Sequence, residues 1–140
     1  MKKFRLRMLT PERTFFDGEV VSVTVVDNEG ERQLLADYLS VVFPLRAAKI
    51  RIDDGRETKI CANGEGFLTV EKDAVYVMCQ TFEWPEEIEL TRVNRAIEEH
   101  ASKLTQEEDE QKRLYHEKTL ERAQARLSVL ALMREKSKRR

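Results

Sequence analysis

The stretch FEWPEEIELTR (residues 82–92) marks the point at which the periodicity of the sequence changes. Upstream of it, apolar and polar residues alternate, as they do in half-buried strands. Downstream, apolar residues recur three or four positions apart and form one face of a helix: Leu90, Val93, Ile97, Ala101 and Leu104. Trp84 precedes a proline and is therefore expected to be extended. The stretch predicts a β domain over residues 1–85 joined to a helical domain over residues 86–140.

The β domain is predicted to contain eight or nine short strands, a number and spacing typical of sandwiches and barrels. Phe4, Leu6 and Met8 begin the series with a clear alternation. Asp17-Gly18 is a strong hairpin signal and predicts a turn after a short run that starts at Thr14. Residues 33–46 are apolar without a clear period, which predicts short strands separated by a loop.

The helical domain is predicted to be an antiparallel hairpin. Pro85 and three glutamates crowd the start of the first helix, where negative charge favours the helix dipole. Thr105 to Glu108 fits a capping box, which predicts that the second helix begins there after a very short break and runs from about residue 107 to about residue 134. Residues 129–133 are apolar on every side, so either the β domain or another chain must cover them. The fold class is therefore α+β, an antiparallel β-sandwich followed by a two-helix hairpin.

Charge is distributed unevenly along the chain, although the net charge is only −1. Residues 86–110 carry a net −6, and residues 111–140 carry a net +7. The near-neutral total argues against an electrostatic nucleic-acid binder. The basic end favours an acidic partner surface, although basic residues in a last helical turn also suit the helix dipole. Neither a signal peptide nor a membrane-spanning run is recognisable, which predicts a cytosolic protein with Cys61 and Cys79 buried and reduced.

The sequence contains no recognisable catalytic constellation. His100 and His116 are sixteen residues apart on predicted helices, with no Cys or Asp at ligand spacing, so we expect surface or interface histidines and no metal site. No serine lies in a nucleophile elbow, and no glycine-rich phosphate loop is present. These observations predict a protein that is not an enzyme and that works by contact.

Three stretches resemble the epsilon subunit family of F-type ATP synthases: FRLRMLTPERTFFDGEVVSVTV (residues 4–25), GRETKICANGEGFLTVEKDAVYV (residues 55–77) and TFEWPEEIELTR (residues 81–92). They occur in the family's order and span nearly the whole chain. RQLLADYLSVVFPL (residues 32–45) departs from the usual Gly-Ile-Leu-Pro-Gly-His, a change that bears on contacts with the gamma subunit and the c-ring. Ile88 to Val93 also departs from the usual Ile-Asp-x-x-Arg-Ala, because Glu89 replaces Asp and Val93 replaces Ala.

The resemblance implies a rotor subunit in the central stalk, peripheral to the cytoplasmic face of the bacterial plasma membrane. The sandwich would bind the gamma subunit and the membrane-embedded c-ring, and so couple proton or sodium flow to ATP synthesis. The hairpin would fold down on the sandwich or extend along gamma toward the catalytic beta and alpha subunits, where it would block ATP hydrolysis.

The resemblance also assigns residues. Basic side chains that would contact an acidic segment of the beta subunit are Arg122, Arg126, Arg134 and Lys136. Some members bind a regulatory ATP between the folded-down helices, and the matching positions are Glu83, Ile88, Glu89, Arg92, Arg122 and Arg126. Arginines at these places suit phosphate groups. The simpler interpretation is helix-surface Glu–Arg pairing between residues three or four apart.

Two other functions fit the same pattern. One is a free-standing β-sandwich adaptor whose hairpin forms a coiled coil with an unrelated partner. The other is an ATP-sensing binding module that acts without attachment to a rotor. Composition and periodicity alone leave both open.

Overall fold

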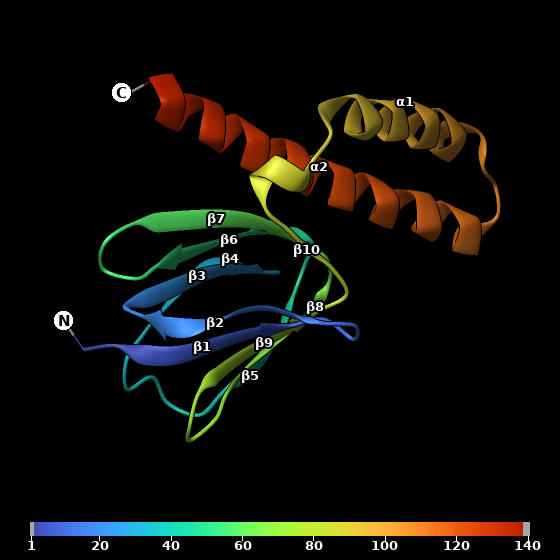
Figure 1. The fold of residues 1–140 in the computed structure, drawn as a ribbon. Helices are drawn as coiled ribbons and strands as arrows, with labels where there is room; N and C mark the ends of the chain where they lie inside the picture. Colours follow the sequence, from blue (N-terminus) through green and yellow to red (C-terminus); the bar gives the residue numbers. More distant parts are fainter. Residues whose placement is uncertain (1, 139–140) are drawn as a thin grey trace.

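The computed structural model describes residues 2–138 and shows two five-stranded sheets followed by two helices (Figure 1). The first sheet has the order β2 (Thr14–Val20), β1 (Phe4–Leu9), β9 (Val75–Cys79), β8 (Gly66–Val70) and β5 (Val42–Leu45). The second has the order β10 (Phe82–Glu83), β7 (Thr58–Asn63), β6 (Ala48–Asp53), β3 (Ser22–Asp27) and β4 (Gly30–Leu35). We call them the β1 sheet and the β6 sheet. The predicted α+β fold of a sandwich followed by two contacting helices is confirmed.

Strand pairing is antiparallel except between β1 and β9, which run parallel. The chain passes from the β1 sheet to the β6 sheet between β2 and β3, at Val21. The turn predicted at Asp17-Gly18 is wrong, because both residues lie within β2 and pair with β1. Asp17 faces two cations of the neighbouring strand, with its carboxylate 2.6 Å from Arg5 Nε and 3.6 Å from Arg7 Nε. These cross-strand pairs stabilise an extended conformation that the local Asp-Gly signal does not favour.

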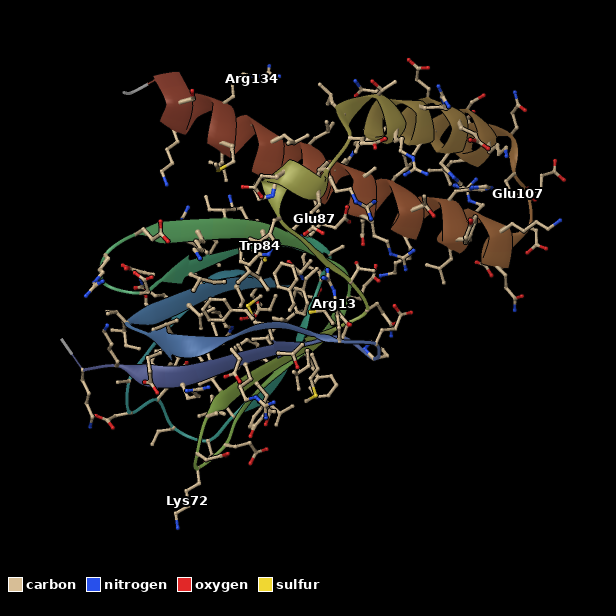
Figure 2. All side chains as sticks on the ribbon, viewed as in Figure 1. Arg13, Lys72, Trp84, Glu87, Glu107 and Arg134 are labelled. Atoms are coloured by element: carbon tan, nitrogen blue, oxygen red, sulfur yellow. The ribbon has the colours of Figure 1, made fainter. Side chains whose placement is uncertain are left out.

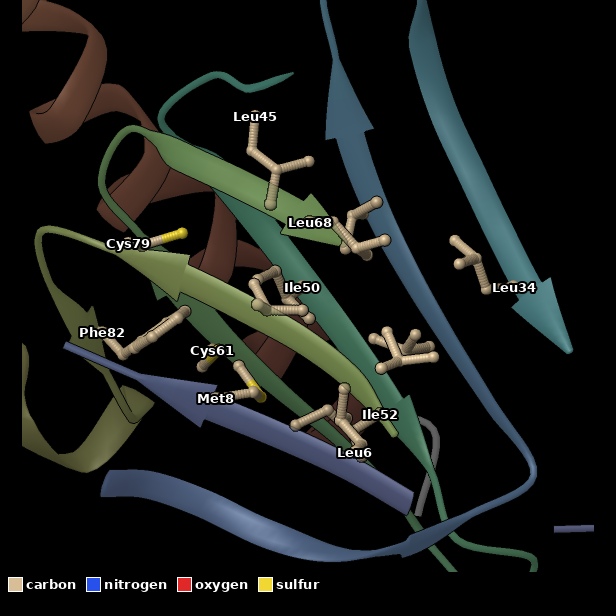
Figure 3. Close-up of a cluster of buried hydrophobic side chains, with 14 of the residues drawn as sticks. Leu6, Met8, Leu34, Leu45, Ile50, Ile52, Cys61, Leu68, Cys79 and Phe82 are labelled. Carbon is tan, nitrogen blue, oxygen red and sulfur yellow. The ribbon is translucent and has the colours of Figure 1, made fainter. Parts of the chain in front are cut away.

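The sandwich core lies between the sheets and consists mostly of aliphatic side chains from both, with Phe82 and two cysteines among them (Figure 3). Leu6, Met8, Ile50 and Leu68 are fully buried there. Cys61 and Cys79 are buried and free, as predicted. Burial raises the pKa of both thiols, that of Cys79 to about 12. Both therefore remain protonated at neutral pH, and protonated buried thiols are inert.

The segment between sandwich and hairpin is fixed at one end. Trp84 is extended, as predicted before a proline. Its indole stacks on Phe15 with a centroid separation of 4.4 Å, and Phe15 stacks in turn on buried Phe82 at 5.1 Å. Pro85–Glu87 then forms the single 3₁₀ turn η1. Because Trp84 is held by the sandwich, any swing of the helices must occur after it.

The first helix, α1 (Leu90–Gln106), begins later than the sequence suggests. Glu86 lies in η1, and Glu89 occupies the N-cap position in an extended conformation, so the glutamates precede the helix and do not form its first turn. The predicted capping box is also wrong. Thr105 remains inside α1, where its hydroxyl donates to Ser102 O at 2.8 Å.

The second helix, α2 (Glu110–Lys138), is capped by Asp109, whose carboxylate accepts from the backbone N–H of Gln111 at 2.9 Å. It is longer than α1 and lies across the outer face of the β6 sheet, against β6 and β7 (Figure 1). Val129 is completely buried there, and Ala123 is 1% exposed. The sandwich therefore covers one side of the apolar end of the hairpin, whereas Leu130, Leu132 and Met133 are half-buried and Ala131 is exposed.

Candidate functional site

A cavity of about 250 Å³ lies where the hairpin meets the sandwich, and we call it the root cavity. Its lining comes from β10, η1 and both helices: Glu83, Glu87, Ile88, Glu89, Arg92, Val93, Ala96 and Arg126. Buried Ile88 and Val93 give it an apolar wall. Two guanidiniums and three carboxylates give it a charged mouth. Five of the eight lining residues are charged, so the cavity is more polar than most small-molecule sites, and its volume is below their usual range of roughly 300–1,000 Å³.

Both guanidiniums of the root cavity are paired with carboxylates in this structure, in which the hairpin packs on the sandwich. Arg126 Nε donates to Glu83 Oε1 at 2.7 Å, which joins α2 to β10. Arg92 Nε lies 3.9 Å from Glu89 Oε2, and both side chains are largely exposed. An anionic ligand would have to displace Glu83 from Arg126, whereas Arg92 is held only weakly.

The root cavity brings together five of the six predicted nucleotide-binding residues and leaves out Arg122. Arg122 makes a bidentate ion pair with Glu65, with Nη2 2.9 Å and Nε 3.1 Å from the carboxylate oxygens. The pairing predicted from helix spacing therefore holds only for Glu89 and Arg92. The pairs of Arg122 and Arg126 are long-range contacts between hairpin and sandwich.

Glu65 stands on a tight connection between β7 and β8. A Cβ atom at Gly66 would collide with the backbone carbonyl of Met78, so only glycine fits after Glu65. Burial is the largest single influence on the pKa of Glu65 and raises it, but the hydrogen bonds and charge of Arg122, together with a backbone hydrogen bond and the charge of Lys118, lower it further, so the net shift is downward. The carboxylate is therefore charged at neutral pH. We call Glu65–Arg122 and Glu83–Arg126 the docking pairs.

The predicted inhibitory cations differ in their surroundings. Arg122 and Arg126 belong to the docking pairs. Lys136 donates to the backbone carbonyl of Thr58 at 3.2 Å. Arg134 is exposed and lies near the C-terminal end of α2, whereas Trp84 and Glu87 lie near the hairpin root (Figure 2). Residues 139–140, the end of the basic tail, fall outside the described residues.

A second candidate surface is the outer face of the β1 sheet, which the helices leave uncovered. Four apolar residues in register cross four strands there, and we call them the apolar row: Pro44, Phe67, Met78 and Leu9. Phe67 is 43% exposed, and neighbouring Val42 is 67% exposed. Contiguous exposed apolar residues of this kind mark interaction sites.

The comparisons with known proteins decide the family. The beta-sandwich domain of the ATP synthase Delta/Epsilon chain matches residues 3–85. The ATP synthase epsilon chain of Caldanaerobacter subterraneus is 32% identical over 135 residues, which cover 96% of this chain and 98% of that one. This chain belongs to the ATP synthase epsilon-chain family. As an epsilon chain it is a non-catalytic subunit of ATP synthase, as predicted.

Other relatives agree with the epsilon-chain assignment. The ATP synthase epsilon chain of Alkaliphilus metalliredigens is 36% identical over 105 residues, which cover 75% of this chain and 78% of that one. A chain in the structure of the Euglena gracilis mitochondrial ATP synthase, OSCP/F1/c-ring, has a TM-score of 0.81 at 24% identity, covering 91% of this chain and 81% of that one. At that identity the match shows a shared fold.

The structure also bears on membrane spanning and on metal binding. No helix within residues 2–138 is long and apolar enough to cross a membrane. The described residues hold no group of three or more His, Cys, Asp or Glu side chains arranged to bind a metal ion. Glu65 was not among the residues predicted from the sequence, because its partner Arg122 lies 57 residues away and no local signal joins them.

Proposed function

We propose that the sandwich attaches this epsilon chain to the rotor. The apolar row on the β1 sheet supports this, because it is exposed, in register and uncovered by the chain's own helices. Its occupant would be the gamma subunit. The β4–β5 loop lies at the end of the sandwich away from the helices (Figure 1), and its Leu39 is 83% exposed, which suits the c-ring. Ion flow, of protons or sodium, would thereby be coupled to ATP synthesis at the cytoplasmic face of the membrane.

The hairpin, residues 86–140, would act as a movable inhibitor of ATP hydrolysis, separate from the sandwich of residues 1–85. The observation that carries this proposal is the composition of its contact with the sandwich. The contact combines a small apolar cluster that includes Ala62, Ala123 and Val129 with the two docking pairs. Ion pairs exchange partners readily in water, so the free energies of the docked and extended hairpin can differ by only a few kcal/mol.

In the extended state, the cations of α2 would face an acidic segment of the catalytic beta subunit. Arg122 and Arg126 would exchange Glu65 and Glu83 for carboxylates of that partner. Arg134 and Lys136 would add charge at the end of the helix. A partner that pairs with these cations only in the extended state shifts the population toward it.

The root cavity would hold a regulatory ATP in the docked state. Arg92 and Arg126 would bind phosphate oxygens, and the apolar wall at Ile88 and Val93 would contact the base. Because Val93 is larger than the alanine usual in the family and the cavity is small, part of the nucleotide would remain in solvent. ATP bound across both helices would stabilise the hairpin in its docked position.

Calorimetric titration of the full chain with ATP tests this site. We expect binding that weakens at least about tenfold in Arg126→Ala, because the variant loses a hydrogen bond from a charged donor to phosphate. Arg134→Ala is the matched control and should bind like the unaltered chain, since Arg134 lies outside the cavity. Arg122→Ala should also bind nearly normally, because Arg122 does not line the root cavity. Absence of binding at millimolar ATP would remove the nucleotide role and leave the mechanical one.

A further inference from the structure

Two histidines meet between the helices at a place that the proposed nucleotide and docking contacts do not use. His100 Nδ1 lies 2.8 Å from His116 Nδ1, and the ring centroids are 5.0 Å apart. His116 is only 8% exposed. Tyr115 meets both rings at their edges, at 5.7 Å from His100 and 5.4 Å from His116. These are the only histidines in the chain.

The short nitrogen–nitrogen distance limits how many protons this histidine pair can hold. One Nδ1 must donate a hydrogen and the other must accept it, because a neutral imidazole carries its proton on only one nitrogen. One added proton leaves this arrangement intact, since an imidazolium can donate to a neutral imidazole. A second proton places a donor on both nitrogens, so that two N–H groups and two like charges face each other. The closed pair therefore accepts one extra proton and rejects the second.

A metal ion is a weaker explanation of the pair. Structural zinc sites use four protein ligands and catalytic sites use three. Two imidazole nitrogens fall short of this, and the described residues supply no cluster of three candidate ligands. Histidine is also the side chain whose ordinary titration lies closest to neutral pH. The geometry thus favours a response to protons.

The charged neighbours come from the same two helices. Glu99 of α1 is the acidic neighbour, and its pKa is lowered first by a hydrogen bond from Lys103 at 2.9 Å and to a smaller extent by the two histidines. Tyr115 is the facing titratable group from α2. Within residues 2–138, the sandwich makes no hydrogen bond or ion pair with either imidazole.

Closure of the pair matters because α1 depends on α2 for its position. α1 packs against α2 and makes no extensive contact with any strand, whereas α2 packs on β6 and β7. At the tip, Arg113 donates to the carbonyls of Leu104 and Glu107 at 3.4 and 3.1 Å. At the root, Val93 and Ile97 belong to the apolar cluster. The histidine pair is the polar contact between these two regions.

We propose that the His100–His116 pair is a pH-sensitive contact that holds α1 against α2 near neutral pH and releases it when a second proton enters. The open hairpin binds one more proton than the closed one, so acid favours opening. Below the pH at which a free imidazole ionises, each further pH unit lowers the ratio of closed to open hairpin by up to about tenfold, because the open state binds one more proton. This opening does not depend on the proposed inhibitory role of the hairpin.

Pulsed EPR on the isolated full chain tests the opening directly. Spin labels at Ser102→Cys and Gln111→Cys place one label on each helix, at exposed positions near the tip. The native thiols are buried and protonated, so they should not take the label. We expect a short distance at pH 7.5 and a growing population of longer distances at pH 5.5. The docking pair of Glu65 stays ionised across this range, because the lowered pKa of Glu65 delays its loss to stronger acid.

The matched control is the same labelled chain with His100→Gln and His116→Gln, whose amides pair without titrating. It should remain closed at both pH values. His100→Gln alone should also remain closed at both pH values, because a protonated His116 can still donate to the amide oxygen. This single variant replaces the double variant as the control if the double variant is not closed at pH 7.5. Identical distances at pH 7.5 and 5.5 in the unaltered chain, or equal opening in the glutamine variants, would overturn the proposal. Because no ATP synthase is present, this result is independent of whether the hairpin inhibits hydrolysis.

Discussion

ATP synthase assembled with a chain that lacks residues 86–140 is expected to retain this subunit and to hydrolyse ATP faster than the complete complex. Retention follows from the sandwich core, which is formed by strands alone and is distinct from the cluster beneath α2. The faster hydrolysis follows if the extended hairpin blocks rotation. A population of complexes that is about nine-tenths inhibited would gain about tenfold in rate.

The measurement is steady-state ATP hydrolysis by complexes reconstituted with equal amounts of the complete or the shortened chain. Co-purification of each chain with gamma controls for assembly. Unchanged hydrolysis with normal assembly would remove the inhibitory role and leave an attachment role. Loss of the shortened chain from the complex would show that the hairpin, and not the sandwich, carries the attachment.

Removal of both docking carboxylates, by Glu65→Gln together with Glu83→Gln, is expected to favour the undocked hairpin. Each pair is partly buried, and Arg122–Glu65 is bidentate, so we assign about 1 kcal/mol to each. Together these values lower the ratio of docked to undocked hairpin by about thirtyfold. EPR distances between a sandwich label and an α2 label in the isolated chain, without nucleotide, measure that ratio.

Two comparisons make this test of the docking pairs specific. Glu117→Gln removes an exposed carboxylate of α2 that takes part in neither pair, and it should leave the ratio unchanged. Acidification of the unaltered chain below the ordinary range of a glutamate, about pH 4.5, should mimic Glu65→Gln. The charged carboxylate of Glu65 stabilises the docked hairpin. Because its pKa is lowered in the docked state, this stabilisation is present above the ordinary pKa and is lost as the pH falls through the lowered pKa. An unaltered ratio in the double variant would show that apolar packing alone docks the hairpin.

The fold could be predicted from sequence because its main signals are local. Alternation in residues 4–8 identified a strand, and the spacing of Val93 and Ile97 identified a helix face. The errors arose where a local signal competes with a second cap residue or with contacts to another strand. Thr105 and Asp109 are both cap residues, and the chain uses Asp109, so α1 continues past the predicted break. Asp17-Gly18 favours a turn, but cross-strand pairs with Arg5 and Arg7 keep it in β2.

The site was less predictable, because its contacts join distant residues. Nothing near Glu65 in the sequence indicates that Arg122 is its partner, and only the placement of α2 on the β6 sheet brings them together. The histidine pair carried a signal that sequence reasoning overlooked. His100 and His116 are each eight residues from residue 108, the middle of the connection between α1 and α2. Residues placed symmetrically about the turn of an antiparallel hairpin face each other.

The central claim is that the hairpin docks reversibly on a sandwich that stays attached to the rotor. Spin labels at Arg56→Cys and Ser137→Cys report it most directly, because Lys136 donates to Thr58 O in the docked state and both labelled positions are exposed next to that contact. In the assembled ATP synthase we predict a short and a long distance, with the short one gaining population when ATP is added. A single short distance under all conditions of nucleotide and turnover would contradict the account.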